Sequence, residues 1–327
     1  MFNMPINTTV SIPLIGDETL TLIPPPCGYR FKKTLLQEYK LKNKITDSSG
    51  QIQSEYRSAL HGTTSPYIIC LEHCETYVIK SDEAITINNH TAAEKFDELV
   101  APICNKIEDE VFKFISLIHL FKEGEFARKR SFYTFGIGPF CYDKTVTYED
   151  SITFLQDPMT IEEAEVAAIT DLLYNHNKAY SILKPVVVDA LEYTYRVIDN
   201  ATNYKSMVTP LEVMFLNNDY GQKKVMLSKR IGAFLGKNDI EMKAIYDTVM
   251  AIYEDRSNAV HEGCVSPITR SALNELRNLV REATKKYISV VEQELAANPA
   301  ITFEEIKATL ISTLKGIVTT KNGQNIW

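Results

Sequence analysis

Long apolar runs are missing from this chain of 327 residues. No stretch holds the roughly 18 consecutive apolar residues that a membrane-spanning helix requires. Residues 1–16 lack a basic leader and an unbroken apolar core, the two marks of a secretory signal peptide. We therefore expect a cytoplasmic protein with no membrane partner.

Cysteine is sparse, and positive charge is not in excess. Six cysteines are scattered through the sequence, unlike the dense disulfide framework of a small secreted domain, so we expect reduced and mostly buried thiols. The net charge of −7 argues against a protein that coats nucleic acid through a broad basic surface. It is compatible with an enzyme that contacts a few phosphates locally. The cysteines are Cys27, Cys70, Cys74, Cys104, Cys141 and Cys264.

The hydrophobic share of 45 % and the charged share of 24 % are those of a globular protein, and the length suffices for two domains. Residues 1–155 are strand-rich. Apolar and polar residues alternate over 8–22, a β-branched run covers 67–87 with an interruption near His73, and an aromatic stretch covers 131–154. We predict a small sheet there.

A helix is predicted between these strands. Thr91 and Glu94 have the spacing of a capping box, and the helix should end at Gly124 with a kink at Pro102.

Cys70, His73 and Cys74 resemble a cluster of metal ligands. In a strand, however, His73 points away from the two cysteines, and no second cysteine pair follows at a zinc-ribbon spacing. We predict no metal site and no cofactor.

From Thr160 onward the sequence has the punctuation of helices in series. The expected signals are a capping box at Thr160 and Glu163, Pro185 in the first turn of a helix ending near Asn200, a start at Thr209-Pro210, a stop at Gly236, a start at Asn238 with Glu241, a start at Ser266-Pro267 reaching about Leu295, and a short helix from Thr302 with Glu305. The fold class is thus α+β. We predict an N-terminal α+β domain over 1–155, an all-α antiparallel helical bundle over 156–298, and a short C-terminal helix with a loose tail over 299–327.

The most informative helix is the one predicted over 240–261. At about 100° per residue its apolar side chains form an arc of roughly 200°, and Arg256 falls in the middle of that arc. Ser257 lies beside Arg256, and His261 falls at the far edge of the arc. The arc contains Ile245, Tyr246, Val249, Met250, Ile252, Tyr253, Ala259 and Val260.

An arginine on an inner helix face requires an anion, because a guanidinium keeps its charge and is costly to bury unpaired. Two interpretations are open. Arg256 forms a structural ion pair with an internal acid such as Glu212 or Glu192, or it faces a phosphate that comes and goes.

The segment Tyr253-Glu-Asp-Arg256-Ser257-Asn258-Ala259-Val260-His261-Glu-Gly263 resembles the signature of HEPN domains, an Arg and a polar residue followed by a His at the end of a bundle helix. Upstream, residues 211–216 and 227–235 resemble the earlier helices of the ApeA-like HEPN group, in the same order and at similar separation. The resemblance covers about 160–296. It departs from the family at Glu262, which separates His261 from Gly263.

This resemblance implies a four-helix bundle that forms a homodimer, with Arg256 and His261 of both protomers lining one cleft that cuts RNA. The residues suit this chemistry. His261 can accept or donate a proton near neutral pH, and Arg256 can hold a phosphate through two donors. Ser257 and Asn258 can orient the phosphate or the imidazole, and Glu212 is a further supporting residue. The cleavage requires no metal.

Arg270, Arg277, Arg281 and Lys285 form a basic stripe at helical spacing. The stripe is either a solvated outer face or a surface that guides RNA toward the cleft.

The leading hypothesis is a metal-independent endoribonuclease whose N-terminal domain responds to a trigger ligand or protein, as in bacterial anti-phage defence or toxin systems of similar arrangement. The first alternative is a catalytically silent HEPN-like module for binding or assembly. A second alternative places an unrecognised enzyme in residues 1–155.

Overall fold

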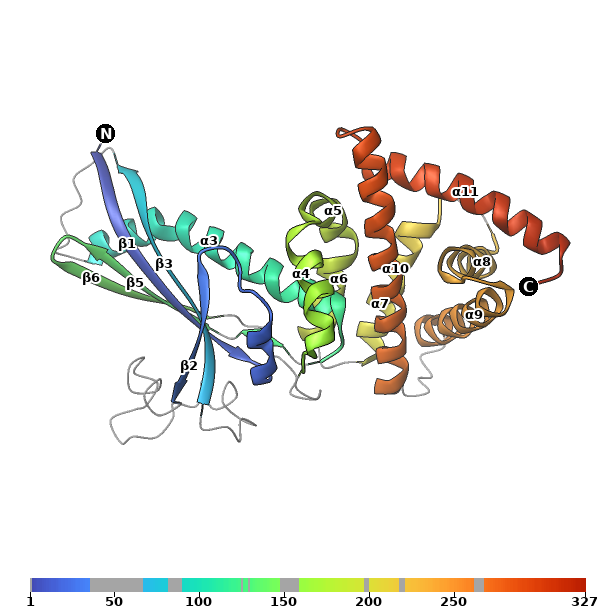
Figure 1. The fold of residues 1–327 in the computed structure, drawn as a ribbon, viewed down its shortest axis with the longest axis horizontal. Helices are drawn as coiled ribbons and strands as arrows, with labels where there is room; N and C mark the ends of the chain where they lie inside the picture. Colours follow the sequence, from blue (N-terminus) through green and yellow to red (C-terminus); the bar gives the residue numbers. More distant parts are fainter. Residues whose placement is uncertain are drawn as a thin grey trace. The chain divides into compact units, whose positions relative to one another are not determined.

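The structure is a computed structural model that describes residues 2–35, 67–81, 90–124, 126–128, 130–147, 159–196, 200–217, 221–261 and 268–327. An antiparallel sheet in the N-terminal half is followed by a helical C-terminal region, which confirms the α+β fold class (Figure 1). The chain divides into two compact units. The sheet unit comprises Met1–Ile115, Gly124–Asp150 and Phe154–Thr170, and the helical unit comprises Ser116–Glu123, Ser151–Thr153 and Asp171–Trp327.

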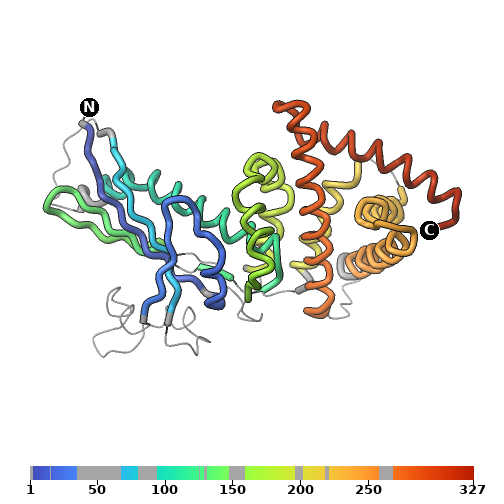
Figure 2. Tube along the Cα trace, in the orientation of Figure 1, coloured from blue at the N-terminus to red at the C-terminus, as the bar shows by residue number. Residues whose placement is uncertain are grey.

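The sheet has the strand order β2-β3-β1-β5-β6 (Figure 2). The short strand β4 pairs with β1. Every pairing is antiparallel. The strands are β1 (Phe2–Ile15), β2 (Tyr29–Leu35), β3 (Tyr67–Ser81), β4 (Ala127–Arg128), β5 (Arg130–Ile137) and β6 (Phe140–Thr147).

Two strand predictions need correction. The alternation predicted over 8–22 ends as a strand at Ile15, and a 3₁₀ helix, η1 (Glu18–Leu22), follows it because Asp17 caps the amide of Thr19. Strand β3 is not interrupted near His73. The imidazole is buried in the strand, where it stacks on Tyr29 at 4.4 Å and its Nδ1 lies 2.9 Å from the Gly28 carbonyl oxygen.

One long helix, α3 (His90–Phe121), covers one face of this sheet. Phe96 packs against Phe135 and Tyr142, and Phe114 packs against Phe31. The alternation in β1 matches this layering, because its even-numbered residues from Ile6 to Leu14 are buried while Asn7 and Thr9 are exposed. Pro102 lies inside α3, and the helix ends shortly before Gly124.

The sequence makes a prediction about metal ligands, buried thiols and membrane-spanning helices, and the described residues bear on each. Within the described ranges, no group of three or more His, Cys, Asp or Glu side chains is arranged to hold a metal ion. Cys70 and Cys104 are buried, whereas Cys27, Cys74 and Cys141 are exposed, so the expectation of mostly buried thiols is wrong; Cys264 lies outside the described residues. None of the helices that the structure describes has the length and apolarity needed to cross a bilayer.

The helical part of the chain follows after a 3₁₀ turn, η2 (Glu163–Glu165). Its helices are α4 (Val166–Tyr174), α5 (Asn177–Leu183), the π-helical η3 (Lys184–Val188), α6 (Asp189–Arg196), α7 (Asn200–Phe215), α8 (Lys223–Leu235), α9 (Asp239–His261), α10 (Arg270–Ala297) and α11 (Phe303–Gly323). An aromatic core joins α7, α8, α10 and α11 through Phe215, Phe234, Tyr287 and Phe303.

Several helix boundaries are as predicted. Gly236 caps the end of α8. Asn238 and Glu241 exchange hydrogen bonds at the start of α9, where the Glu241 amide donates to Asn238 Oδ1 at 3.0 Å. Thr302 and Glu305 form the capping box of α11. These signals are local, so the sequence suffices to predict them.

Other boundaries are wrong. The capping box before α4 joins Glu162 and Glu165 instead of Thr160 and Glu163. Pro210 does not start a helix but lies inside α7, where buried apolar neighbours on both sides hold the helix together. Pro185 lies in η3, a local widening that relieves the clash of a proline ring with the preceding turn.

The C-terminal region also differs from its prediction. Thr269 caps α10, and the predicted start at Ser266-Pro267 lies outside the described residues. The last helix, α11, has 21 residues and is therefore not short. It includes Lys321–Gly323, and the ring centres of Trp327 and Tyr246 lie 5.9 Å apart. The tail over 321–327 is therefore not loose.

Candidate functional site

Helix α9 carries the predicted catalytic segment, and its backbone is helical through His261. Val249 and Ile252 are buried, while Tyr253 and Met250 at the sides of the predicted arc are partly exposed. The side chain of Arg256 is 26 % exposed, so it lies at the margin of the buried face. A charged group in this position can meet both the interior and an incoming ligand.

The carboxylate of Glu212 on α7 joins two residues of α9. The Tyr253 hydroxyl donates to Glu212 Oε1 at 3.0 Å, and Arg256 Nη2 donates to Glu212 Oε2 at 3.4 Å. Tyr253 and Arg256 lie one helical turn apart, with the Arg256 guanidinium carbon 5.5 Å from the centre of the Tyr253 ring. The fold therefore assembles a Glu212–Tyr253–Arg256 cluster from positions 41 and 44 residues apart.

The guanidinium of Arg256 is only partly engaged. Its Nε is buried and has no hydrogen-bond partner among the residues that the structure describes. Nη2 makes a single long bond, beyond the usual range of a charge-assisted hydrogen bond. Among the residues that the structure describes, Arg256 thus keeps unused donors.

Tyr253 is a hydrogen-bond donor at neutral pH. Burial raises the pKa of its hydroxyl, and the hydrogen bond and the charge of Glu212 raise that pKa further, while Arg256 lowers it. Because the raised pKa keeps the phenol protonated, Glu212 Oε1 faces a neutral donor and Oε2 faces a cation.

The structure places Arg256 and His261 on one helix, five residues and about 7.5 Å of helical rise apart. The side chains of Asn258 and His261 lie outside the described part of the chain, and Ser257 next to Arg256 is partly exposed. The roles predicted for these residues stay predictions.

The predicted basic stripe on α10 is wrong at two positions, because Arg277 and Arg281 are each only 2 % exposed. Both guanidiniums contact the carboxylate of Glu123, two residues after the end of α3. Helical spacing alone could not reveal this acid, which lies 154 residues from Arg277 in the sequence. Arg270, the first residue of α10, and Lys285 are partly exposed.

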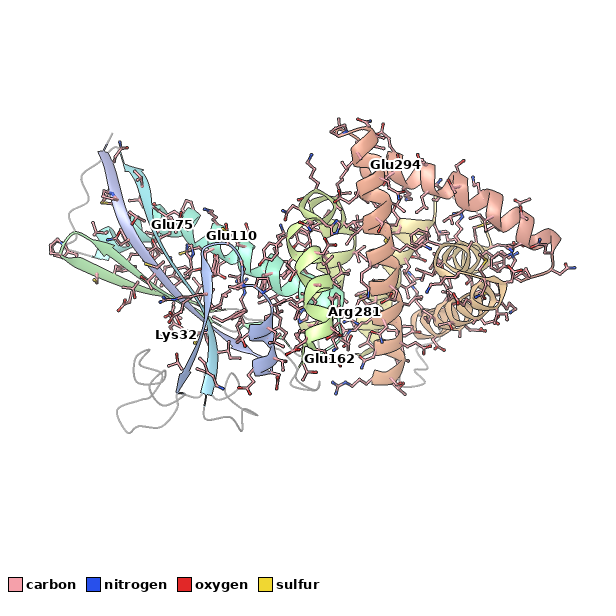
Figure 3. All side chains as sticks on the ribbon, viewed as in Figure 1. Lys32, Glu75, Glu110, Glu162, Arg281 and Glu294 are labelled. Carbon is pink, nitrogen blue, oxygen red and sulfur yellow. The ribbon has the colours of Figure 1, made fainter. Side chains whose placement is uncertain are left out.

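Each of Arg277 and Arg281 donates hydrogen bonds from all three of its guanidinium nitrogens (Arg281 is labelled in Figure 3). Arg277 Nε donates to Thr194 Oγ1 at 2.9 Å, and Arg281 Nε donates to the His119 carbonyl at 2.6 Å. The other nitrogens bond Glu123, Asn274, the Thr194 carbonyl, Asn278 and the Tyr195 hydroxyl. These arginines are saturated structural residues of the helical unit.

Glu192, the other acid considered as a partner of Arg256, belongs to the same buried cluster. Its Oε1 lies 2.7 Å from Nδ1 of His119, whose ring stacks on Tyr195 at 4.1 Å. Glu212 is therefore the acid that meets Arg256.

No family model, curated protein or solved structure matches the chain. The likeness to HEPN domains therefore stays a prediction based on the residues around Arg256 and His261.

Proposed function

We propose that this protein is a metal-independent endoribonuclease whose catalytic residues are Arg256 and His261, with Glu212, Ser257 and Asn258 in supporting roles. The observation that carries the proposal is the incomplete engagement of Arg256. Arg277 and Arg281 use every guanidinium nitrogen, whereas Arg256 uses one toward the described residues and lies partly exposed at the helix margin. Spare donors on a fixed cation suit a phosphate that binds and leaves.

The proposed reaction is attack of a ribose 2′-hydroxyl on the adjacent phosphorus. His261 takes the hydroxyl proton or protonates the leaving 5′-oxygen, since an imidazole titrates near neutral pH. Arg256 stabilises the charge that develops on the phosphate oxygens. The products are a 2′,3′-cyclic phosphate and a 5′-hydroxyl, and DNA, which lacks the 2′-hydroxyl, is not a substrate.

We further propose a homodimer with a composite site. Arg256 and His261 are separated along α9 too widely to surround one phosphate within a single chain, whereas a twofold axis would supply two of each residue. The sheet unit is the proposed receptor of the trigger. Helix α3 has residues in both units, so it is the element through which binding at the sheet unit would affect the helical unit. The setting in anti-phage defence or a toxin system rests on the HEPN resemblance.

Expression of the wild type beside His261→Ala tests the proposal in cells. Loss of RNA integrity and slower growth with the wild type, both absent with His261→Ala, are expected. Equal RNA degradation by both proteins would contradict the assignment of His261.

The second candidate function is a catalytically silent HEPN-like module for binding or assembly. The ion pair between Arg256 and Glu212 is the observation that favours it, because a structural arginine is expected to have such a partner. The two functions differ in what Arg256→Ala does: loss of cleavage with an intact fold supports the enzyme, and loss of the fold supports the module.

A further inference from the structure

The two oxygens of Glu212 have different partners, and this division limits how strongly the carboxylate can hold Arg256. Oε1 accepts from the Tyr253 hydroxyl at 3.0 Å, a normal hydrogen bond. Oε2 alone faces Arg256, at 3.4 Å. A carboxylate with both oxygens free would bind a guanidinium through two parallel hydrogen bonds, which is a stronger arrangement.

A carboxylate and a phosphate compete for the same donors of a guanidinium. Glu212 therefore occupies part of the surface of Arg256 that a phosphate would need. The side chains of Arg256 and Glu212 are 26 % and 22 % exposed, so part of this pair is open to solvent.

We propose that the role of Glu212 is regulatory: its carboxylate is a built-in competitor for the phosphate-binding guanidinium of Arg256, and Tyr253 is a positioning residue that keeps this competitor weak by holding Oε1. This inference rests on the proposed function for the identity of the substrate, an RNA phosphate, and adds the regulation of the same site.

The proposal fixes the sign of three effects. Glu212→Gln removes the competing charge and raises anion affinity. Tyr253→Phe keeps the ring but frees Oε1, so the carboxylate pairs with Arg256 through both oxygens and anion affinity falls. In the double variant the phenylalanine has no effect, because there is no carboxylate for Tyr253 to hold.

The test measures binding to the full-length chain of two probes, inorganic pyrophosphate and a fluorescently labelled single-stranded RNA, in a His261→Ala background that prevents cleavage. We expect Glu212→Gln to tighten binding about threefold and Tyr253→Phe to weaken it about threefold, the size of a partly exposed ion-pair contribution. The double variant should bind as Glu212→Gln does. If Glu212 and Tyr253 only supported the fold, their two substitutions would not shift anion affinity in opposite directions.

Matched controls come from the same helix. Tyr246→Phe removes a phenol hydroxyl and keeps the ring that packs near Trp327. Glu254→Gln removes a carboxylate charge paired with Lys224 at 3.0 Å. Both should leave affinity unchanged. Thermal unfolding of each variant excludes loss of the fold as the cause.

The outcomes separate the two proposals. Equal affinity of all variants for both probes, or an effect of Tyr253→Phe that persists beside Glu212→Gln, would overturn the competition. No binding of either probe, even by Glu212→Gln, would also overturn it. The expected pattern with pyrophosphate but no binding of RNA would support the competition and overturn the ribonuclease.

Discussion

Toward the residues that the structure describes, Arg256 donates a single hydrogen bond, from Nη2 to Glu212 Oε2 at 3.4 Å, and its buried Nε has no partner among them. Arg281, in the same helical unit, engages all three of its guanidinium nitrogens. The difference distinguishes an arginine with spare donors from one that the interior has saturated, and it sets the expectations for their variants.

Arg256→Ala should abolish RNA cleavage and change the free energy of unfolding by less than about 1 kcal/mol, because a partly exposed ion pair contributes little. Chemical denaturation followed by circular dichroism, beside an RNA cleavage assay, measures both. Unfolding of this variant would instead identify Arg256 as a structural ion-pair partner.

Arg281→Ala should destabilise the protein by about 3 kcal/mol or more, since it removes a saturated buried cation and weakens the pairing of Glu123. The control is Arg270→Ala at the partly exposed start of α10, with an expected change within about 0.5 kcal/mol. Equal effects of the two substitutions would contradict the buried placement of Arg281.

The sequence predicts features that depend on neighbours in the chain. Gly236 at the end of α8 and the Asn238–Glu241 start of α9 are such features, and both are correct. The sequence does not predict contacts between residues that are distant in the chain. Neither the burial of Arg281 against Glu123 nor the hydrogen bond from Tyr253 to Glu212 follows from helical periodicity, because each depends on how helices pack.

The candidate site shows the same limit. The wheel of residues 240–261 locates Arg256 on the apolar side of the helix, and the structure places it at the edge of the buried face. On the helical wheel Tyr253 counts only as an apolar side chain. Its hydroxyl is seen to hold Glu212 only in the structure, where α7 places Glu212 Oε1 3.0 Å from it.

Cysteine reactivity tests the sheet unit. Burial raises the pKa of the Cys104 thiol to about 11, so almost none is thiolate at pH 8, and the side chain is also shielded. We expect iodoacetamide to modify exposed Cys74 and Cys141 quickly and Cys104 only after unfolding, as measured by mass spectrometry of peptides. Early modification of Cys104 would contradict its buried position on α3.

Assembly is the next test. A homodimer should have a mass of about 74 kDa by light scattering, twice the chain mass of 37.1 kDa. If the cleft is composite, a mixture of Arg256→Ala and His261→Ala chains should recover part of the activity that each lacks alone. A monomer at all concentrations, with RNA present, would contradict the composite site.

The most direct test of the central claim is analysis of the RNA ends produced by the purified protein in EDTA, with His261→Ala as the control. We predict cleavage of single-stranded RNA that leaves 2′,3′-cyclic phosphates and is absent from His261→Ala, because the attacking group is the ribose hydroxyl itself and no metal takes part. Cleavage that EDTA abolishes, or products with 3′-hydroxyl ends, would contradict the account.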